Sequence, residues 1–237
     1  MNHSIHIISI FNLAFAFIPV LVALGILFKW SLDVGNALYS LVRMVVQLIL
    51  VGYVLVFIFE SNSALITVGV LCLMILASSW IALRTIKQAR MTLFPYTVIS
   101  SLLGGASVLL VMIWPVLQLT PVYKPEYTIP LAGMIFANAM NAMSIAMERL
   151  YAEMENNVPF ERARKIGFNA SMIPIVNTMF AVGLVSLPGM MTGQVLAGVS
   201  PLIAVRYQIM VMCMIFASSA LSVACLFVLG KSKFELR

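Results

Sequence analysis

Long runs of apolar residues, separated by short polar segments, dominate the hydropathy pattern of the chain. A helix that spans a membrane needs about 20 mostly apolar residues. Seven stretches meet this requirement, so the pattern predicts an all-α membrane protein with about seven transmembrane helices. The predicted spans cover residues 5–28, 38–59, 64–83, 95–117, 127–147, 170–187 and 203–229.

The composition points to a chain that is solvated largely by lipid. Of the 237 residues, 62% are hydrophobic and 9% are charged, and the mean hydropathy is +1.07. Soluble domains contain about 25% charged residues, and the 14 basic and 8 acidic side chains here are too few to cover a water-facing surface. The composition excludes a soluble enzyme, a nucleic-acid-binding protein and a disulfide-stabilised module. We therefore expect a single transmembrane domain over residues 1–237 in the plasma membrane.

The basic residues predict an orientation, because Lys and Arg are retained in cytoplasmic connections. One alternating set of connections holds eleven basic residues, whereas the other holds only Lys124 and Arg206. We expect the N-terminus outside and the C-terminus in the cytoplasm, with a cytoplasmic loop at about 148–168 and an external loop at about 188–202. The eleven residues are Lys29, Arg84, Lys87, Arg90, Arg149, Arg162, Arg164, Lys165, Lys231, Lys233 and Arg237.

Polar side chains inside three of the predicted spans are candidates for a translocation path. Arg43 and Gln47 are four residues apart, and hence on one helical face. An arginine at this depth either snorkels to the interface and hydrogen-bonds another helix, which is the simpler interpretation, or takes part in transport. Asn138 and Asn141 in the fifth span and Asn177 in the sixth can hold helices together or line a polar path.

Methionines are concentrated in the fifth and seventh spans. Thioether sulfur suits soft cations, although methionine more often fills irregular packing gaps, and packing is the preferred interpretation. Met134 is included among the candidate path residues. The other methionines of these two spans are Met140, Met143, Met147, Met210, Met212 and Met214.

The connection between the sixth and seventh spans is uncharged and rich in glycine. Pro188 and Gly189 should interrupt the helix, and the spacing of Gly189 and Gly193 favours close packing. Irregular backbone near membrane depth persists only when it is buried in protein or lines a cavity. A substrate gate and a tightly packed loop are both open interpretations, and Arg206 lies at the mouth of the following span.

The expected cytoplasmic loop mixes four acidic with four basic residues between Glu148 and Gly167. Solvation explains such a segment in the simplest case. Its second part, FERARKIG at residues 160–167, alternates charged with apolar residues and could instead dock a partner protein. The candidate contact residues are Glu161, Arg162, Arg164 and Gly167.

Several of these stretches together resemble the FetB-type permeases. The most specific match is GLVSLPGMMTG at residues 183–193, followed by YQIMV at 207–211; Arg43, Gln47 and VGY at 51–53 also match. That family comprises membrane subunits of small ABC transporters linked to iron export in bacteria, with plant relatives linked to aluminium tolerance. The resemblance implies a homodimeric permease that pairs with a separate ATPase subunit and exports iron or another metal ion.

One segment departs from the family pattern. Family members usually carry a longer cytoplasmic loop with a Leu-Gly-Ala stretch that resembles the coupling segment of ABC permeases. No such stretch lies between Met147 and Ile173. The chain therefore lacks the stretch through which the resemblance would predict a contact with the ATPase.

The resulting hypothesis is a permease subunit that is not itself an enzyme. The chain has no GxxxxGK[ST] phosphate-binding motif, so we expect that it binds no cofactor and that the partner subunit hydrolyses ATP. An ion-gradient-driven carrier or channel is the main alternative. Carboxylates deep in the membrane would favour it, but Glu60 and Glu126 lie only at the ends of predicted spans. A membrane enzyme would need clustered catalytic groups, whereas His3 and His6 are isolated near the N-terminus. A purely structural subunit is a further class.

Overall fold

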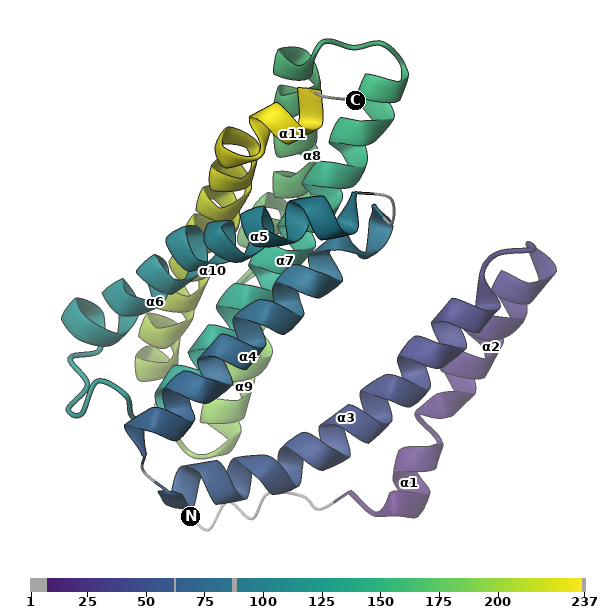
Figure 1. Cartoon of the computed structure of the whole chain (residues 1–237). Helices are drawn as coiled ribbons and strands as arrows, with labels where there is room; N and C mark the ends of the chain where they lie inside the picture. Colours follow the sequence, from purple (N-terminus) through teal and green to yellow (C-terminus); the bar gives the residue numbers. More distant parts are fainter. Residues whose placement is uncertain (1–7, 62, 87–88, 236–237) are drawn as a thin grey trace. The chain divides into compact units, whose positions relative to one another are not determined.

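The computed structural model describes residues 8–61, 63–86 and 89–235, and within these residues the regular structure is helical (Figure 1). A single isolated bridge between Val182 and Ser186 is the exception among the described residues. The all-α prediction is therefore confirmed. Residues 5–7 of the first predicted span, together with His3, His6, Lys87 and Arg237, lie outside the described residues.

The chain forms two compact units, residues 1–61 and 62–237. The first contains α1 (Ile10–Ala14), α2 (Phe17–Lys29) and α3 (Val34–Ser61). Ser31 at the turn between α2 and α3 has a positive φ of 55°. The Asp33 carboxylate then accepts a hydrogen bond of 2.9 Å from the backbone N–H of Asn36, as an N-capping side chain does. The expectation of a single permease domain stays a prediction.

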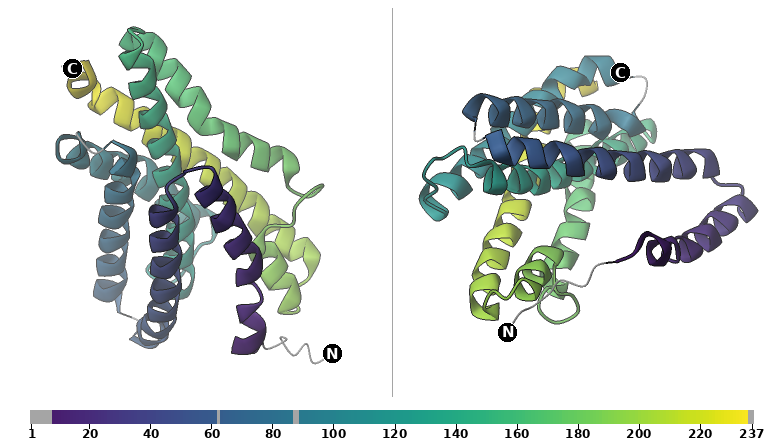
Figure 2. Two further views of the ribbon diagram at one scale, coloured as in Figure 1. Left: turned by 90° about the vertical axis from the view of Figure 1, so that its right-hand side faces the viewer. Right: turned by 90° about the horizontal axis from the view of Figure 1, so that it is seen from below.

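The second unit contains the longer series of helices. It comprises α4 (Ala64–Ala82), η1 (Leu83–Thr85), α5 (Arg90–Ser100), η2 (Ser101–Ala106), α6 (Ser107–Val111), η3 (Met112–Val116), α7 (Pro125–Glu155), α8 (Phe160–Ala181), α9 (Gly189–Leu196), α10 (Pro201–Leu229) and α11 (Lys231–Glu235). Helix α7 lies at its centre and packs along α4, α8 and α10 (Figures 1 and 2).

Six helical stretches in the described residues are long and apolar enough to cross a membrane. They overlap the first to fifth and the seventh predicted spans, which confirms a multi-span membrane protein. The predicted span at 170–187 corresponds to the second half of α8 and is not among the six. That helix starts within the charged segment and ends at Ala181, so its uncharged part from Ile166 covers only about 24 Å at 1.5 Å per residue.

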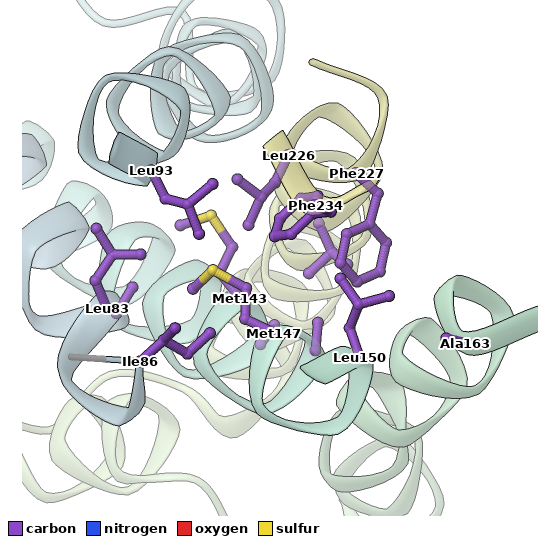
Figure 3. Close-up of a cluster of buried hydrophobic side chains, with 14 of the residues drawn as sticks. Leu83, Ile86, Leu93, Met143, Met147, Leu150, Ala163, Leu226, Phe227 and Phe234 are labelled. Atoms are coloured by element: carbon purple, nitrogen blue, oxygen red, sulfur yellow. The ribbon is translucent and has the colours of Figure 1, made fainter. Parts of the chain in front are cut away.

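The interior of the second unit is apolar and centred on α7. Met143, Met147 and Leu150 of α7 are fully buried against Leu226 and Phe227 of α10 (Figure 3). The same cluster includes residues of α4, η1, α5, α8 and α11. Methionines at these positions therefore fill the core, in agreement with the packing interpretation for Met143 and Met147.

A close contact between backbones holds α10 against η2. A Cβ atom added to Gly104 would lie 2.4 Å from the backbone nitrogen of Ser222, so only glycine allows this approach. The segment η2 is a π-helix, and a second π-helical segment, η3, follows with Pro115 inside it. Small residues thus bring these apolar helices together, as is common in membranes.

Two segments that we expected to be loops are largely helical. Helix α7 continues to Glu155 and α8 begins at Phe160, so only residues 156–159 connect them. The turn needs a left-handed residue, and Asn157 has a φ of 62°. The expected external loop at 188–202 contains α9. Charge and glycine content suggested loops at both places, but mixed charges also suit an exposed helix end, and α9 tolerates its two glycines.

Candidate functional site

The charged end of α8 is tied to α11 through Glu161. The Glu161 carboxylate accepts a hydrogen bond of 3.0 Å from Lys231 Nζ and pairs with Arg164 one turn along its own helix. The hydrogen bond from Lys231 is the main reason that the pKa of Glu161 lies below its ordinary value; desolvation opposes this shift, and the charge of Arg164 reinforces it. The group is exposed, so these contacts order the surface more than they stabilise the fold.

Aromatic side chains pack beneath this charged cluster, on the side of the protein core. The ring of Phe160 stacks on that of Phe234 with centroids 6.1 Å apart, and the cations of Arg164 and Lys231 lie 5.9 and 5.8 Å from the Phe160 centroid. Phe234 is fully buried and also meets Phe227 edge to face. The short helix α11 is therefore anchored to the start of α8.

The other two candidate coupling residues differ from each other. Arg162 is exposed and available to a partner protein. Gly167 is buried, and an added Cβ would lie 2.6 Å from the carbonyl oxygen of Ala146 in α7. Gly167 thus permits the close approach of α7 and α8 and does not present a docking surface.

The candidate path amides lie on α7 and α8 but show different environments. Asn138 is half-buried, and its Nδ2 donates a hydrogen bond of 2.8 Å to the carbonyl oxygen of Met134 in the same helix. That bond is within one helix and does not join two. Asn141 and Asn177 are exposed on the surface of the second unit. Met134 is half-buried against the apolar core.

Arg43 and Gln47 lie in α3, in the first unit, and both are exposed there. Helix α3 starts at Val34, so Arg43 is about two and a half turns inside it. Its position relative to Asn138 and Asn141 stays a prediction.

The segment that follows α8 makes two sharp changes of direction. Gly183 and Gly198 have φ values of 84° and 89°, a conformation that glycine adopts without strain. Pro188 precedes α9, and the Thr192 hydroxyl donates a hydrogen bond of 3.2 Å to its carbonyl oxygen. The chain is therefore non-helical between Ala181 and Gly189, so α8 ends before the Pro-Gly pair and the pair marks the start of α9.

The spacing of Gly189 and Gly193 does not reflect close packing. A Cβ atom added at either glycine would meet no other atom within 4 Å. The GxxxG pattern favours close helix approach but does not guarantee that a helix lies on that face. Arg206 is exposed on the second turn of α10.

A cavity of about 470 Å³ lies among the end of α8, α9 and α10. Three methionines line it, Met179, Met191 and Met212, together with Cys213 and Gln208. Gln208 is 5% exposed, and its Oε1 atom has no hydrogen-bond partner among the described residues. Sequence reasoning considered Met212 only as one of a methionine group and did not single out the other four. A glutamine within an apolar run was the signal that could have drawn attention to this place.

Buried serines form a second feature that the sequence did not reveal. Ser79 and Ser101 share a hydrogen bond of 3.2 Å between α4 and η2. The hydroxyls of Ser100, Ser219 and Ser222 are buried without a partner in the described part of the chain. No group of three or more His, Cys, Asp or Glu residues there is arranged to hold a metal ion.

Comparison with known proteins identifies relatives along nearly the whole chain. The sequence pattern of an uncharacterised protein family, UPF0014, matches residues 10–160 and 158–234. The two matched stretches meet at residues 158–160, at the turn between α7 and α8. No solved structure matches the chain.

Relatives in bacteria and plants are similar over most of their length. A UPF0014 membrane protein of Synechocystis is 36% identical over 79% of this chain and 78% of its own. The probable iron export permease protein FetB of Escherichia coli is 34% identical over 93% and 90%. The protein ALUMINUM SENSITIVE 3 of Arabidopsis thaliana is 31% identical over 88% and 81%. This chain therefore belongs to the UPF0014 family of multi-span membrane proteins.

Proposed function

We propose that this protein is the membrane-spanning permease subunit of an ABC-type transporter that exports a metal ion such as iron from the cell. The observation that carries the proposal is the similarity, over 93% of the chain, to a protein named as a probable iron export permease. Six helices of membrane-spanning length agree with a permease. A separate ATPase subunit supplies the energy, because the chain carries no phosphate-binding motif.

Helix α8 is suited to transmit a movement across the protein. It is continuous from Phe160 to Ala181, a length of about 33 Å. Its first turn carries the charged cluster around Glu161, and its last turn leads into Gly183 and α9. A push by the ATPase near Glu161, Arg162 and Arg164 would therefore move the segment that contains Pro188 and Gly189.

The exposed amides are evidence that the protein pairs with a second copy of the chain. Asn141 and Asn177 lie on the surface of the second unit, on helices that are otherwise apolar at this level. Amide groups that face hydrocarbon are costly, so protein or water covers them in the membrane. In a homodimer whose subunits meet near these residues, the second subunit and a water-filled translocation path at the contact would cover the two amides.

The shortened connection changes how the ATPase can bind. Only residues 156–159 separate α7 from α8, which leaves little chain for a projecting coupling segment. In this proposal the contact consists of the exposed start of α8 together with α11, through Glu161, Arg162, Arg164 and Lys231. Lys231 and Glu161 already hold these two helices together.

The test is reconstitution of the permease in proteoliposomes with an ABC-type ATPase subunit that co-purifies with it. We expect ATP-dependent movement of Fe²⁺ across the membrane, and stimulation of ATP hydrolysis by the permease. The matched control is the same ATPase with its phosphate-loop lysine replaced by alanine, which should abolish both signals. Transport by the permease alone, with no ATP, would contradict the proposal and favour a gradient-driven carrier.

A further inference from the structure

We propose that the cavity bounded by the end of α8, α9 and α10 binds a soft monovalent cation of the Cu(I) class. Its ligands would come from the thioethers of Met179, Met191 and Met212 and the thiol of Cys213, and the amide of Gln208 lies beside them in the lining. This inference rests on the proposed transport function, because it assigns a class of cargo to a site beside the segment that contains Pro188 and Gly189.

The first argument is convergence from three separate elements. Met179 lies in α8, Met191 in α9, and Met212 with Cys213 in α10, yet all line one cavity. Two of these methionines, Met179 and Met191, lie outside the methionine-rich runs of the fifth and seventh spans. Packing alone does not require four sulfur atoms around one empty volume.

The second argument is the unpaired amide of Gln208. Its side chain lines the cavity and is 5% exposed, and its Oε1 atom lacks a hydrogen-bond partner among the described residues. A buried polar atom with no hydrogen-bond partner is unfavourable, because it has lost the hydrogen bonds that it would make to water. A water molecule bound next to the cation would donate a hydrogen bond to that oxygen and so provide the missing partner.

The chemistry of the lining decides the class of cation. Thioether and thiol sulfur select soft ions such as Cu(I), whereas carboxylate, carbonyl and water oxygens suit Mg²⁺, Ca²⁺ and Mn²⁺. Among the described residues no Asp, Glu or His lines this cavity, so the cavity has few ligands for a hard divalent ion. The site therefore differs in selectivity from the cargo named for the relative in Escherichia coli.

The volume of the cavity is compatible with closure around an ion. About 470 Å³ exceeds what one dehydrated ion fills. Methionine has three rotatable bonds and a polarisable sulfur, so the three side chains can turn inward when a ligand enters. Met179 is 42% exposed and Cys213 is also exposed, which leaves an entry route from the surface.

The experiment measures Ag⁺ binding to the purified full-length permease in detergent, without any ATPase. Ag⁺ is a redox-stable analogue of Cu(I), and chloride-free nitrate buffer keeps it in solution for titration calorimetry. The test protein is the triple variant Met191→Leu, Met212→Leu, Cys213→Ser. The matched control is Met44→Leu, Met91→Leu, Cys72→Ser, which changes three sulfur residues that are exposed elsewhere.

We expect the cavity variant to bind Ag⁺ at least about 10-fold more weakly, because even groups that only support metal ligands change affinity by 10- to 100-fold. The control variant should match the unsubstituted protein. Single variants Met191→Leu and Met212→Leu, which nearly conserve volume, provide the comparison if the triple variant does not fold.

Equal Ag⁺ affinity of cavity and control variants overturns the proposal, and so does an unsubstituted protein that does not bind Ag⁺. A cavity occupied by a lipid chain would give the first of these results. Since no ATPase is present, either result leaves the proposed ABC-type function standing. Conversely, Ag⁺ binding with no ATP-driven transport would reject that function and retain the site.

Discussion

The two ends of α8 differ in almost every physical respect. The end at Phe160 is charged on its surface and well packed beneath, with Phe160 on Phe234 and Gly167 against α7. The end at Ala181 is apolar, leads into glycines with open space around them, and borders a cavity. In the proposed mechanism, a push at the well-packed end of α8 moves the loosely packed end. Substitutions at the two ends should therefore have unequal effects.

The largest expected difference comes from removing one aromatic ring at each end. Phe234→Ala deletes a fully buried side chain that meets three other rings, and such changes cost about 3–5 kcal/mol. Phe180→Ala, at the other end, removes a ring that is 79% exposed and should change stability little. Thermal unfolding of both variants in the same detergent measures the contrast. Equal losses would show that the end at Ala181 is packed as firmly as the other.

A smaller contrast is expected for adding one methyl group. Gly167→Ala places a Cβ 2.6 Å from the Ala146 carbonyl oxygen, and overpacking of this kind costs about 1–3 kcal/mol. Gly193→Ala meets no atom within 4 Å and should be neutral or slightly stabilising, because alanine favours helix over glycine by up to about 1 kcal/mol. The midpoint temperature of unfolding should fall for the first variant only. A fall for Gly193→Ala would indicate that another copy or a partner covers α9.

The smallest expected effect concerns the charge of Glu161. Its pKa is lowered in the folded protein, mainly by the hydrogen bond from Lys231. The ionised carboxylate therefore stabilises the fold above the pKa that Glu161 has in the unfolded chain, and this stabilisation is lost as the pH falls through its pKa in the folded protein. Glu161→Gln should therefore lower the unfolding midpoint slightly at pH 7 and have no effect in acid. High salt should shrink the difference, because the pair is exposed. An unchanged difference in acid or at high salt would assign the effect to packing.

The same variant tests the coupling proposal in a separate assay. If the start of α8 and α11 form the ATPase contact, Glu161→Gln should reduce stimulation of ATP hydrolysis by more than its small effect on stability explains. Arg149 pairs with Glu153 on α7, and Glu153→Gln is the matched control, an acidic residue in an ion pair outside this contact. Similar losses in both variants would remove the special role of Glu161.

Hydropathy predicted the class of the protein and most of its spans, because a membrane selects long apolar helices through local composition alone. The exception at 170–187 is instructive. The apolar run suggested a span, but α8 starts in the charged segment before it and ends at Ala181 before the run is over. Where a helix begins depends on turn geometry, here Asn157 with its positive φ and Pro159 at the helix start, which a hydropathy window does not register.

The candidate residues show the same difference between properties that local sequence predicts and contacts that depend on the fold. Glu161 and Arg164 lie outside the apolar core, as expected because charge in an apolar chain is costly unless exposed, and their contact with an ATPase stays a prediction. Gly167 was grouped with them by sequence proximity, although it faces α7 and is buried. The pairing of Glu161 with Lys231, 70 residues away, could not be anticipated from the sequence.

Length, hydropathy and charge were thus sufficient to establish a lipid-immersed helical protein, since each of these properties acts residue by residue on the solvent. Contacts between distant segments required the folded chain. The backbone approach of Gly104 to Ser222 and the meeting of Met179, Met191, Gln208 and Met212 at one cavity depend on how helices far apart in sequence are set against each other. Apolar periodicity shows which residues avoid water, but in a membrane nearly every face of a helix does so, and it cannot tell which face meets which neighbour.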